Sequence, residues 1–337
     1  MREIFVRLTA NAILIWSFAC FYFFNSYYSS FLNADTKNTI LVLAILLSTV
    51  SLVEATFLAK RKRLNYGLKL WLSLKQLWCS AVSVIQNSKH GFQLGFSAKR
   101  NLLFALVKFF FTPIMIKFAV GNFNAIQFKL NFFASHEMDW FSIAFFNDHF
   151  YGLALAMIFL IDTGFFAFGY LFEASWLKNK IRSVDTSFFG WFVALACYPP
   201  FTDVFAKWAP WHTNDYAWFG SAEVTFGVRI LLLFLLIGYV AATVSLGTKC
   251  SNLTNRGIVT KGAYAIVRHP AYICKNLFWW IVLIPAIPNT PLAIFGMAFW
   301  TFMYFLRAAT EERHLIKDPD YQAYCRQVRW RFVPGVI

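Results

Sequence analysis

Side chains able to bind a ligand concentrate in residues 262–335. Arg268-His269-Pro270 places a cation and an imidazole at a predicted helix start, because proline is favoured in the first helical turn. Unpaired backbone N–H groups and the positive end of the helix dipole there can hold a carboxylate or phosphate. Tyr264 and Tyr272 add aromatic faces suited to a flat ring or a sulfonium cation. Arg, His and Tyr are also ordinary anchors at a membrane surface, so the motif alone does not decide.

A second group of charged side chains follows about 40 residues later. Arg307 and Glu311 are spaced i,i+4 on a predicted helix, and Glu312 comes next. As an exposed ion pair, Arg307 and Glu311 would contribute only a few tenths of a kcal/mol. Two adjacent carboxylates can also bind the vicinal hydroxyls of a ribose or pair with Arg268. Both interpretations stay open at this level.

A helical hairpin must position these two groups. The apolar runs 271–288 and 290–308 are each about long enough to cross a bilayer, and the turn signal at Asn289 separates them. His269 lies 20 positions before Asn289 and Glu311 lies 22 positions after it. At ~1.5 Å per residue, both return to about the same depth on the same side of the membrane. The spacing therefore predicts one shared site.

The end of the chain is predicted to lie near that site. Asp318-Pro319 has the residue types of an N-cap and a first helical turn. The short helix that follows carries Tyr321, Tyr324 and Cys325, and Pro334-Gly335 closes the segment. We expect this tail to cover the site as a lid.

Composition indicates a polytopic membrane protein. The chain has 59% hydrophobic and 20% aromatic residues, with only 14% charged. The net charge of +15 is compatible with nucleic-acid binding, but its position argues against it. The cations lie in loops between apolar runs, as membrane topology requires. We therefore expect no nucleic-acid partner.

Eight membrane spans are predicted, giving an all-α transmembrane bundle with a C-terminal cytosolic helical tail. Besides the hairpin they are 8–24, 39–58, 102–120, 150–172, 187–205 and 224–246. With the N-terminus in the cytosol, about 25 of the 31 Lys and Arg fall on the cytosolic side. The C-terminus is then cytosolic too, in a bacterial inner membrane or the endoplasmic reticulum.

Two regions depart from simple spans. Residues 64–85 show helical apolar periodicity with Lys and Gln opposite, which favours a helix lying in the interface over a further span. Residues 122–148 are expected to form a Phe- and Asn-rich connection. Within 187–205, Tyr198-Pro199-Pro200 is expected to break the helix, either as a kink or to line a cavity.

Isolated polar residues carry weaker signals. We expect Arg229, well inside a span, to pair with Glu223 at the outer interface rather than to bind substrate. Asp162 also lies in a span, without a partner that the sequence identifies. The six Cys show no CxxC or CxxH spacing, so we expect unpaired thiols and no metal. Cys274 is expected to be a small packing residue.

The motifs of the hairpin resemble those of one enzyme family. The pattern G-x-Y-x-x-V-R-H-P-x-Y, then R-x-x-x-E-E-x-x-L, Y-x-x-Y and a terminal V-P-G is similar to the isoprenylcysteine carboxyl methyltransferase family and related membrane phospholipid methyltransferases. The matching residues are Gly262, Tyr264, Val267, Arg268, His269, Pro270, Tyr272, Arg307, Glu311, Glu312, Leu315, Tyr321, Tyr324, Val333, Pro334 and Gly335. The resemblance covers about the last 80 residues. It departs at Cys274, where the family commonly has Gly.

The resemblance implies a methyltransferase that uses S-adenosylmethionine (SAM) and a lipophilic or lipid-modified acceptor from the bilayer. Residues 251–337 would form the cofactor-binding hairpin and tail, and residues 1–250 would determine the substrate. We expect His269 and Arg268 to hold the methionine carboxylate, with Tyr264 and Tyr272 lining the adenosine and sulfonium pocket. Glu311 and Glu312 would bind ribose or amino groups. Arg307 would orient the acceptor or pair with Glu311, making Arg307 and Glu311 the catalytic candidates.

Two other classes remain open. Membrane sterol reductases, which use NADPH, carry a similar tail with an acidic pair and a Tyr-Cys near the end, as Tyr324-Cys325 here. A non-catalytic membrane scaffold or transporter is the third class. No glycine-rich loop follows a predicted strand, so a soluble Rossmann-type cofactor site is not expected.

Overall fold

A computed structural model describes residues 2–57, 66–86 and 92–336, and nearly all regular structure in them is helical. The predicted all-α class is confirmed. Two short strands, β1 Ser183–Val184 and β2 Thr254–Asn255, pair antiparallel. The chain divides into two compact units, Met1–Val120 and Gly121–Ile337, and each is described by itself.

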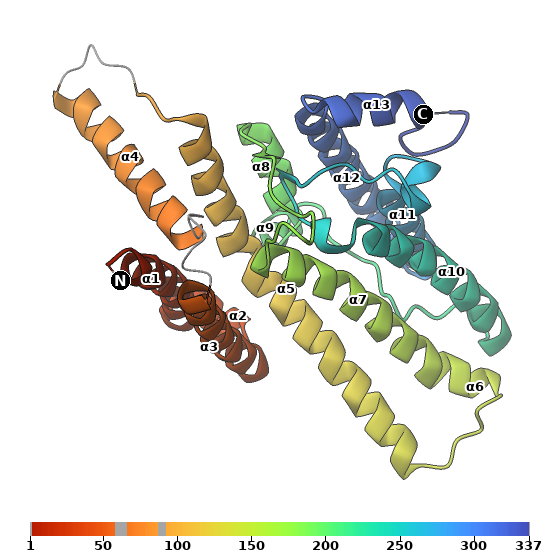
Figure 1. Ribbon diagram of the computed structural model, residues 1–337. Coiled ribbons are helices and arrows are strands. Elements are labelled where there is room, and N and C mark those ends of the chain that lie inside the picture. Colours follow the sequence, from red (N-terminus) through yellow and green to blue (C-terminus); the bar gives the residue numbers. More distant parts are fainter. Residues whose placement is uncertain (1, 58–65, 87–91, 337) are drawn as a thin grey trace. The chain divides into compact units, whose positions relative to one another are not determined.

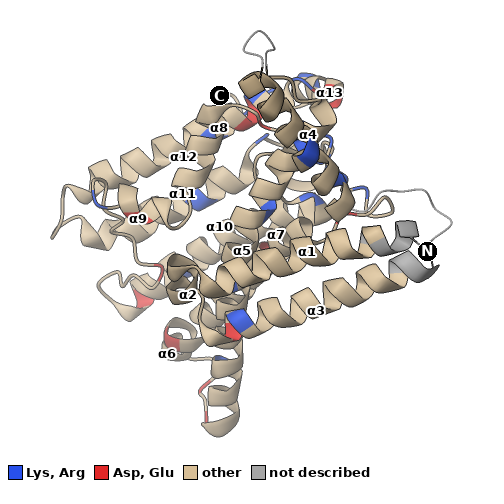
Figure 2. Ribbon diagram, turned by 90° about the vertical axis from the view of Figure 1, so that its left-hand side faces the viewer, with Lys and Arg blue, Asp and Glu red and all other residues tan. Residues whose placement is uncertain are grey.

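The first unit consists of four helices and the first part of a fifth. They are α1 Arg2–Phe24, α2 Ser26–Phe31, α3 Ala34–Phe57, α4 Tyr66–Gln86 and α5 Phe96–Ser135. Helix α1 packs against α3 and α4 (Figure 1). Asn25 caps α2 through its side-chain oxygen, and the Tyr22 hydroxyl ties α1 to the Phe109 carbonyl at 2.7 Å. Charged residues are sparse along these helices (Figure 2). The basic run Lys60 to Arg63 lies outside the described residues.

Helix α5 is longer than predicted. We expected an irregular connection over 122–148, but α5 continues without interruption to Ser135. After Pro113 the sequence contains no proline up to that point, and its Asn, Gln, Lys and Phe side chains are all tolerated in a helix. The polar connection therefore starts only after Ser135.

The second unit carries the residues of the predicted site. Its long helices are α7 Tyr151–Leu171, α10 Ala222–Leu246, α11 Pro270–Leu283 and α12 Ala293–Leu315. Its short elements are α6 Ile143–Phe145, η1 Phe146–Phe150, α8 Phe188–Ala196, α9 Phe201–Phe205, η2 Gly247–Lys249, η3 Gly262–Ala265, η4 Ile284–Ala286 and α13 Pro319–Gln327. Helix α10 packs between α7 and α11, and α12 packs against α8 and α11.

Two apolar cores hold these helices together. The first joins α7, α10 and α11 through residues such as Leu155, Leu232 and Phe278. The second joins α8, α11 and α12 around Trp300, whose indole N–H donates to the carbonyl of Ala209 at 3.0 Å. Because lipid tails are as apolar as these side chains, close van der Waals packing rather than removal from water is what such cores contribute between membrane helices.

Five helical stretches within the described residues are long and apolar enough to cross a membrane. They are Ala34–Val53, Phe96–Ser135, Ile143–Leu171, Ala222–Lys249 and Ala293–Leu315. Leu8–Phe24 and Pro270–Ala286 are shorter apolar helices. Helix α4, predicted to lie in the interface, is not among the five. Length and composition thus support five of the eight predicted spans directly.

The predicted span 187–205 is broken in the structure, as Pro199 and Pro200 lead one to expect. Helix α8 ends at Ala196, and α9 begins at Phe201. Neither piece is long enough to cross a bilayer alone. The break leaves Tyr198 outside the regular helices, and its hydroxyl accepts a hydrogen bond from Arg307 of α12.

Two polar residues inside predicted spans have partners that the sequence did not reveal. Arg229 does not pair with Glu223; its guanidinium donates to backbone carbonyls, including that of Asn147 at 2.6 Å and that of Tyr216 at 3.0 Å. The carbonyls are exposed where π-helical and irregular backbone approaches α10, so a long side chain can reach them. Asp162 accepts hydrogen bonds from two hydroxyl groups of α10. Both residues therefore have hydrogen-bond partners within the protein, although the Nε atom of Arg229 is buried without one in the described structure.

Candidate functional site

The α11–α12 hairpin brings the two charged motifs together. The His269 Nε2 atom, at the start of α11, lies 3.0 Å from Glu312 Oε1 near the end of α12. The Tyr272 hydroxyl donates to Glu311 Oε2 at 3.0 Å. The predicted return of both ends to one place is therefore what the structure shows.

The start of α11 is fixed by the C-terminal tail. His269 is the N-cap and Pro270 the first helical residue. The backbone N–H groups of Arg268 and His269 donate to the carbonyls of Trp330 and Arg331, each at 2.9 Å. The tail thus runs alongside the Arg-His-Pro motif. These contacts bring Arg331 into the site, although no local sequence pattern pointed to it.

Glu312 is the centre of a buried cluster of charges. Glu312 is only 6% exposed. Its carboxylate lies 3.0 Å from His269 Nε2, 3.3 Å from Arg268 Nε and 2.8 Å from Arg331 Nε. The Arg268 contact is an ion pair without hydrogen-bond geometry. Burial alone would lower the pKa of Arg268, but Cys325 and Glu312 outweigh it and raise the pKa. Glu312 therefore holds three cationic or imidazole groups at once.

Glu311 differs from its neighbour although the two are adjacent in sequence. Glu311 is exposed, and within the described part of the chain its carboxylate accepts one hydrogen bond, from the Tyr272 hydroxyl. The Tyr272 ring stacks on the His269 ring with centroids 5.4 Å apart and 5° between the planes. Burial and then the Glu311 carboxylate raise the pKa of Tyr264, which keeps that phenol protonated. Glu311 is consequently the carboxylate most open to a ligand.

Arg307 lies one turn before Glu311 and points into a different environment. It does not pair with Glu311, which was one of two expected alternatives. Its guanidinium donates to Asn252 Oδ1 and, at 3.3 Å, to the Tyr198 hydroxyl. Its Cζ atom lies 5.7 Å from the ring centroid of Tyr272. Arg307 is 8% exposed, so it is a buried cation held by neutral groups.

Three site residues escaped the sequence interpretation. Tyr198 and Asn252 contact Arg307 from connections far away in the sequence, and Arg331 contacts Glu312 from the tail. The helix break at Pro199-Pro200 was the only signal that pointed to Tyr198, through the possibility that broken helices line a cavity. Asn252 and Arg331 carry no local pattern, because their places depend on tertiary contacts alone.

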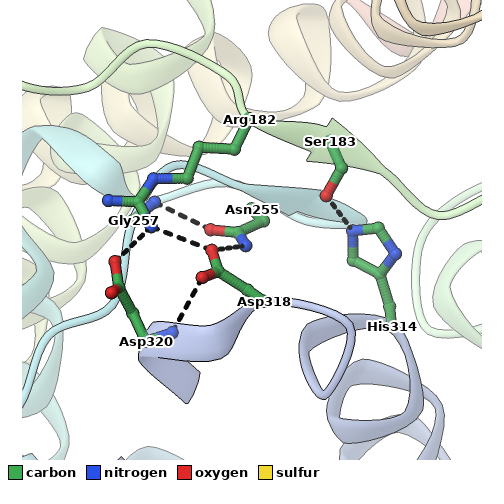
Figure 3. A network of polar contacts seen from close by, with 7 residues as sticks. All are labelled: Arg182, Ser183, Asn255, Gly257, His314, Asp318 and Asp320. Atoms are coloured by element: carbon green, nitrogen blue, oxygen red, sulfur yellow. Dashed lines mark hydrogen bonds and ion pairs between the residues drawn. The ribbon is translucent and has the colours of Figure 1, made fainter. Parts of the chain in front are cut away.

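The tail helix is attached by a polar network. Asp318 is the N-cap of α13, as predicted, and accepts from the backbone N–H of Asp320 at 3.0 Å. Arg182 Nη1 lies 2.9 Å from Asp318 and 2.5 Å from Asp320, and Asn255 donates to Asp318 at 2.7 Å (Figure 3). Arg182, just before β1, and Asn255, in β2, thus hold the beginning of the tail helix. His314 of α12 is hydrogen-bonded to Ser183 of β1, so α12 contacts the same strand pair.

The apolar face of α13 completes this attachment. Tyr321, Tyr324 and Val328 form a buried cluster, and the Tyr324 hydroxyl donates to the Tyr264 carbonyl at 2.7 Å. Gly262, which begins the same motif, has φ +64°, and a side chain there would collide with Ser245. Both features hold the segment before Arg268 against its neighbours.

The departure from the family motif at Cys274 has a packing explanation. A Cβ atom added at Gly238 of α10 would lie 3.0 Å from Cys274 Sγ. The thiol therefore fills the space that the glycine of α10 leaves between α10 and α11, and Cys274 packs against the first core. All six cysteines are free. The described residues hold no group of three His, Cys, Asp or Glu side chains that could bind a metal ion.

The donor and acceptor groups of the site fit SAM chemically. Arg268 and Arg331 offer guanidinium groups for a carboxylate. The Arg331 side chain is 42% exposed, so a ligand can reach it. The Glu311 carboxylate suits an ammonium group or ribose hydroxyls. Asn276 Oδ1, one turn after Tyr272, is buried without a partner in the described structure and can accept a further hydrogen bond. Tyr264 and Tyr272 offer aromatic faces for a sulfonium cation.

Comparison with known proteins gives one match. No curated protein sequence and no solved structure matches this chain. Residues 227–317 match the model of the Isoprenylcysteine carboxyl methyltransferase (ICMT) family. This range contains all of α11 and α12, most of α10 and both charged motifs. The match confirms the resemblance of the C-terminal region to that family.

Proposed function

We propose that this protein is an integral membrane methyltransferase that uses SAM and acts on a lipophilic or membrane-associated acceptor. One observation carries the proposal. Within the region that matches the ICMT family, the Arg-His-Pro motif and the Glu311-Glu312 pair meet in one cluster at the ends of α11 and α12. Support comes from the geometry and the family match together.

The proposed cofactor-binding residues are Tyr264, Arg268, His269, Tyr272, Glu311 and Glu312, with different tasks. Glu312 orients Arg268 and His269, because its buried carboxylate already contacts both. Arg268 then presents its remaining N–H groups to the methionine carboxylate. Glu311, exposed beside Tyr272, binds the ammonium group or the ribose.

The proposed catalytic residues are Arg307 and Glu311. SAM supplies an activated methyl group on a sulfonium sulfur. The protein contributes alignment, a high effective concentration of the acceptor and exclusion of water. Arg307, one turn deeper than Glu311, orients the acceptor from its aromatic surroundings. An anionic acceptor needs no general base, whereas an amine or hydroxyl acceptor needs one.

The proposed topology follows from the charge distribution. Eight spans place both termini and the site in the cytosol, where SAM is available, in a bacterial inner membrane or the endoplasmic reticulum. Residues 251–337 form the cofactor-binding part. Residues 1–250, including the helix α4 at the interface, shape access for the acceptor from the bilayer. No nucleic acid or metal has a role in this proposal.

The direct test is SAM binding to the purified protein in detergent. Calorimetry on wild type, His269→Ala and Glu311→Ala should show binding that is weakened at least tenfold in both variants, the expected effect of losing a charged hydrogen bond. Unchanged affinity in both variants would rule out this site. Thermal stabilisation by NADPH rather than SAM would instead favour a reductase, and stabilisation by neither would favour a non-catalytic protein.

The acceptor class can be approached with labelled SAM. Incubating the protein with total membrane lipid and, separately, with membrane protein extract would show which fraction receives the label. The Glu311→Ala variant is the matched control, because we expect the loss of an exposed side chain to leave the fold intact while it removes the open carboxylate. Label in neither fraction would contradict the proposal of a membrane-associated acceptor.

A further inference from the structure

The connection that follows α7 is built around the side chain of Asn179, which is fully buried. Its amide nitrogen donates to the carbonyls of Phe172 at 2.9 Å and Thr248 at 3.3 Å. Its amide oxygen accepts from the backbone N–H of Ala174 at 2.9 Å. The Thr248 hydroxyl in turn donates to the carbonyl of Leu177 at 3.3 Å. These bonds fix the segment after α7 against η2, the segment that follows α10.

The fixed segment presents one aromatic and one basic side chain to the outside. Trp176 is 81% exposed. Lys178 is exposed as well, and its backbone N–H closes a turn by donating to the Ser175 carbonyl at 3.2 Å. The φ of Lys178 is +52°, which is uncommon outside glycine and must be held by the surrounding contacts. The two side chains therefore stand at defined places.

Lys249 brings a second ammonium group to the same face. Its Nζ atom lies 3.4 Å, and Arg182 Nη2 lies 3.2 Å, from the position that a Cβ atom at Gly257 would take. The two cationic groups are therefore neighbours. The positive charges of Arg182 and Lys178 both act on the Lys249 ammonium group. Three cations from two separate connections thus gather on one face.

The carboxylates of the tail compensate only one of these cations directly. Arg182 pairs with Asp318 and Asp320 (Figure 3). Among the described residues, neither Lys178 nor Lys249 forms an ion pair. The Asp320 charge also acts on Lys249, but against those of two cations. Like charges held close together repel each other, so the two lysines favour a further anion beside them.

The cluster lies where two apolar helices end. Helix α7 ends at Leu171 and α10 at Leu246, and both belong to stretches long and apolar enough to cross a membrane. Lysines there also complement the negative ends of the helix dipoles, which is the simpler explanation for their presence. That explanation does not account for Trp176. An exposed indole is favoured at the level of lipid headgroups, and nearby lysines attract anionic lipids.

We propose that Lys178, Lys249 and Trp176 form a binding site for the headgroup of an anionic phospholipid. The lysines bind the phosphate, and Trp176 lies at the headgroup level beside the start of the acyl chains. The lipid supplies the negative charge that the tail carboxylates do not, next to the contacts that attach α13. This inference does not depend on methyl transfer and requires only that the helices are embedded in a membrane.

The test is lipid binding to the purified full-length protein in detergent, measured by native mass spectrometry. The probes are phosphatidylglycerol and phosphatidylcholine with identical acyl chains, so that only the net charge of the headgroup differs. Each lysine at a membrane surface should contribute about fivefold for an anionic lipid, and two should contribute about 30-fold. We expect phosphatidylglycerol to bind more tightly by about 10- to 30-fold. Equal affinities for the two lipids would overturn the proposal.

Variants assign the preference to the cluster. Lys178→Met and Lys249→Met should each reduce the preference for phosphatidylglycerol about fivefold, and the double variant should lose it. Trp176→Ala should weaken the binding of both lipids. Lys317→Met, which removes an exposed cation just after α12, is the matched control and should bind like wild type. An equal loss in Lys317→Met would indicate diffuse attraction by net charge and would overturn the site.

A thermal measurement separates lipid binding from compensation of the helix ends. The difference in Tm between wild type and the double lysine variant should be larger in phosphatidylglycerol nanodiscs than in phosphatidylcholine nanodiscs. An equal difference in both lipids is what a role at the helix dipoles alone would give, and it would overturn the proposal.

Soluble anions separate a lipid from other anionic ligands. Glycerol 3-phosphate and a tetraglutamate peptide, at the concentration of the lipid, should not displace phosphatidylglycerol, because neither has acyl chains for the membrane side of the site. Displacement by glycerol 3-phosphate would assign the cluster to a soluble phosphate, and displacement by the peptide would assign it to an acidic protein. Either result would overturn the lipid assignment.

Discussion

The contrast between Glu311 and Glu312 gives the sharpest prediction. Glu312→Gln removes the negative charge that holds Arg268 and His269, both at most 12% exposed at the side chain. Breaking a buried ion pair costs about 3–5 kcal/mol, and the retained amide oxygen favours the lower end. We therefore expect a loss of about 3 kcal/mol in the free energy of unfolding. Glu311→Gln affects an exposed residue with one hydroxyl partner and should cost about 1 kcal/mol or less.

Thermal unfolding in detergent would measure both variants. For a unit of this size, about 3 kcal/mol corresponds to a decrease of about 6–12 °C in Tm, against about 2–4 °C or less for Glu311→Gln. SAM affinity should show the complementary pattern, since Glu311→Gln loses its ligand contact at nearly wild-type stability. Equal destabilisation by the two variants, or a stable Glu312→Gln protein, would refute the assignment of separate tasks.

Further predictions concern the tail and the packing of α7. Asp318→Ala removes the N-cap of α13 and the contact with Arg182, and should cost about 1–2 kcal/mol, seen as faster hydrogen exchange in Pro319–Gln327. Burial raises the pKa of Asp318, but hydrogen bonds from Arg182, from Asn255 and from the Asp320 backbone outweigh it, so the pKa is lowered in the folded protein. This contribution is present above the unfolded pKa of about 3.9 and is lost as pH falls through the folded value, so exchange in α13 should rise only below about pH 4. Gly169→Ala would drive a methyl group into the Cys250 carbonyl and should cost about 1–3 kcal/mol or more, measured as Tm, whereas Gly164→Ala, in open space on the same helix, should be neutral.

The sequence predicts the helix break beside Tyr198, but only the tertiary structure shows that the break contributes a residue to the site. The sequence predicts the break, because two consecutive prolines remove two backbone donors. It does not decide between a simple kink and a cavity wall. In the structure the unwound segment directs the Tyr198 hydroxyl toward Arg307 and Asn252. The break therefore belongs to the site rather than only to the fold.

Local patterns determined the helical class, the hairpin and the two charged motifs. Apolar runs, turn residues and caps act over a few positions, so they can be recognised without knowing what surrounds them. The fixed rise of an α-helix then places His269 and the Glu311-Glu312 pair on one side. The same reasoning located the N-cap Asp318, which the structure confirms.

Only the tertiary structure decided which charges meet. Nothing in the sequence distinguishes Glu311 from Glu312, yet successive helical residues point about 100° apart, so one is buried among cations and the other is exposed. Arg229 was wrongly paired with Glu223, because its reach to distant backbone carbonyls depends on how irregular segments pack around α10. Arg331 and Asn252 likewise gained their partners from chain segments that are distant in sequence, and pairings of that kind follow from packing rather than from any local pattern.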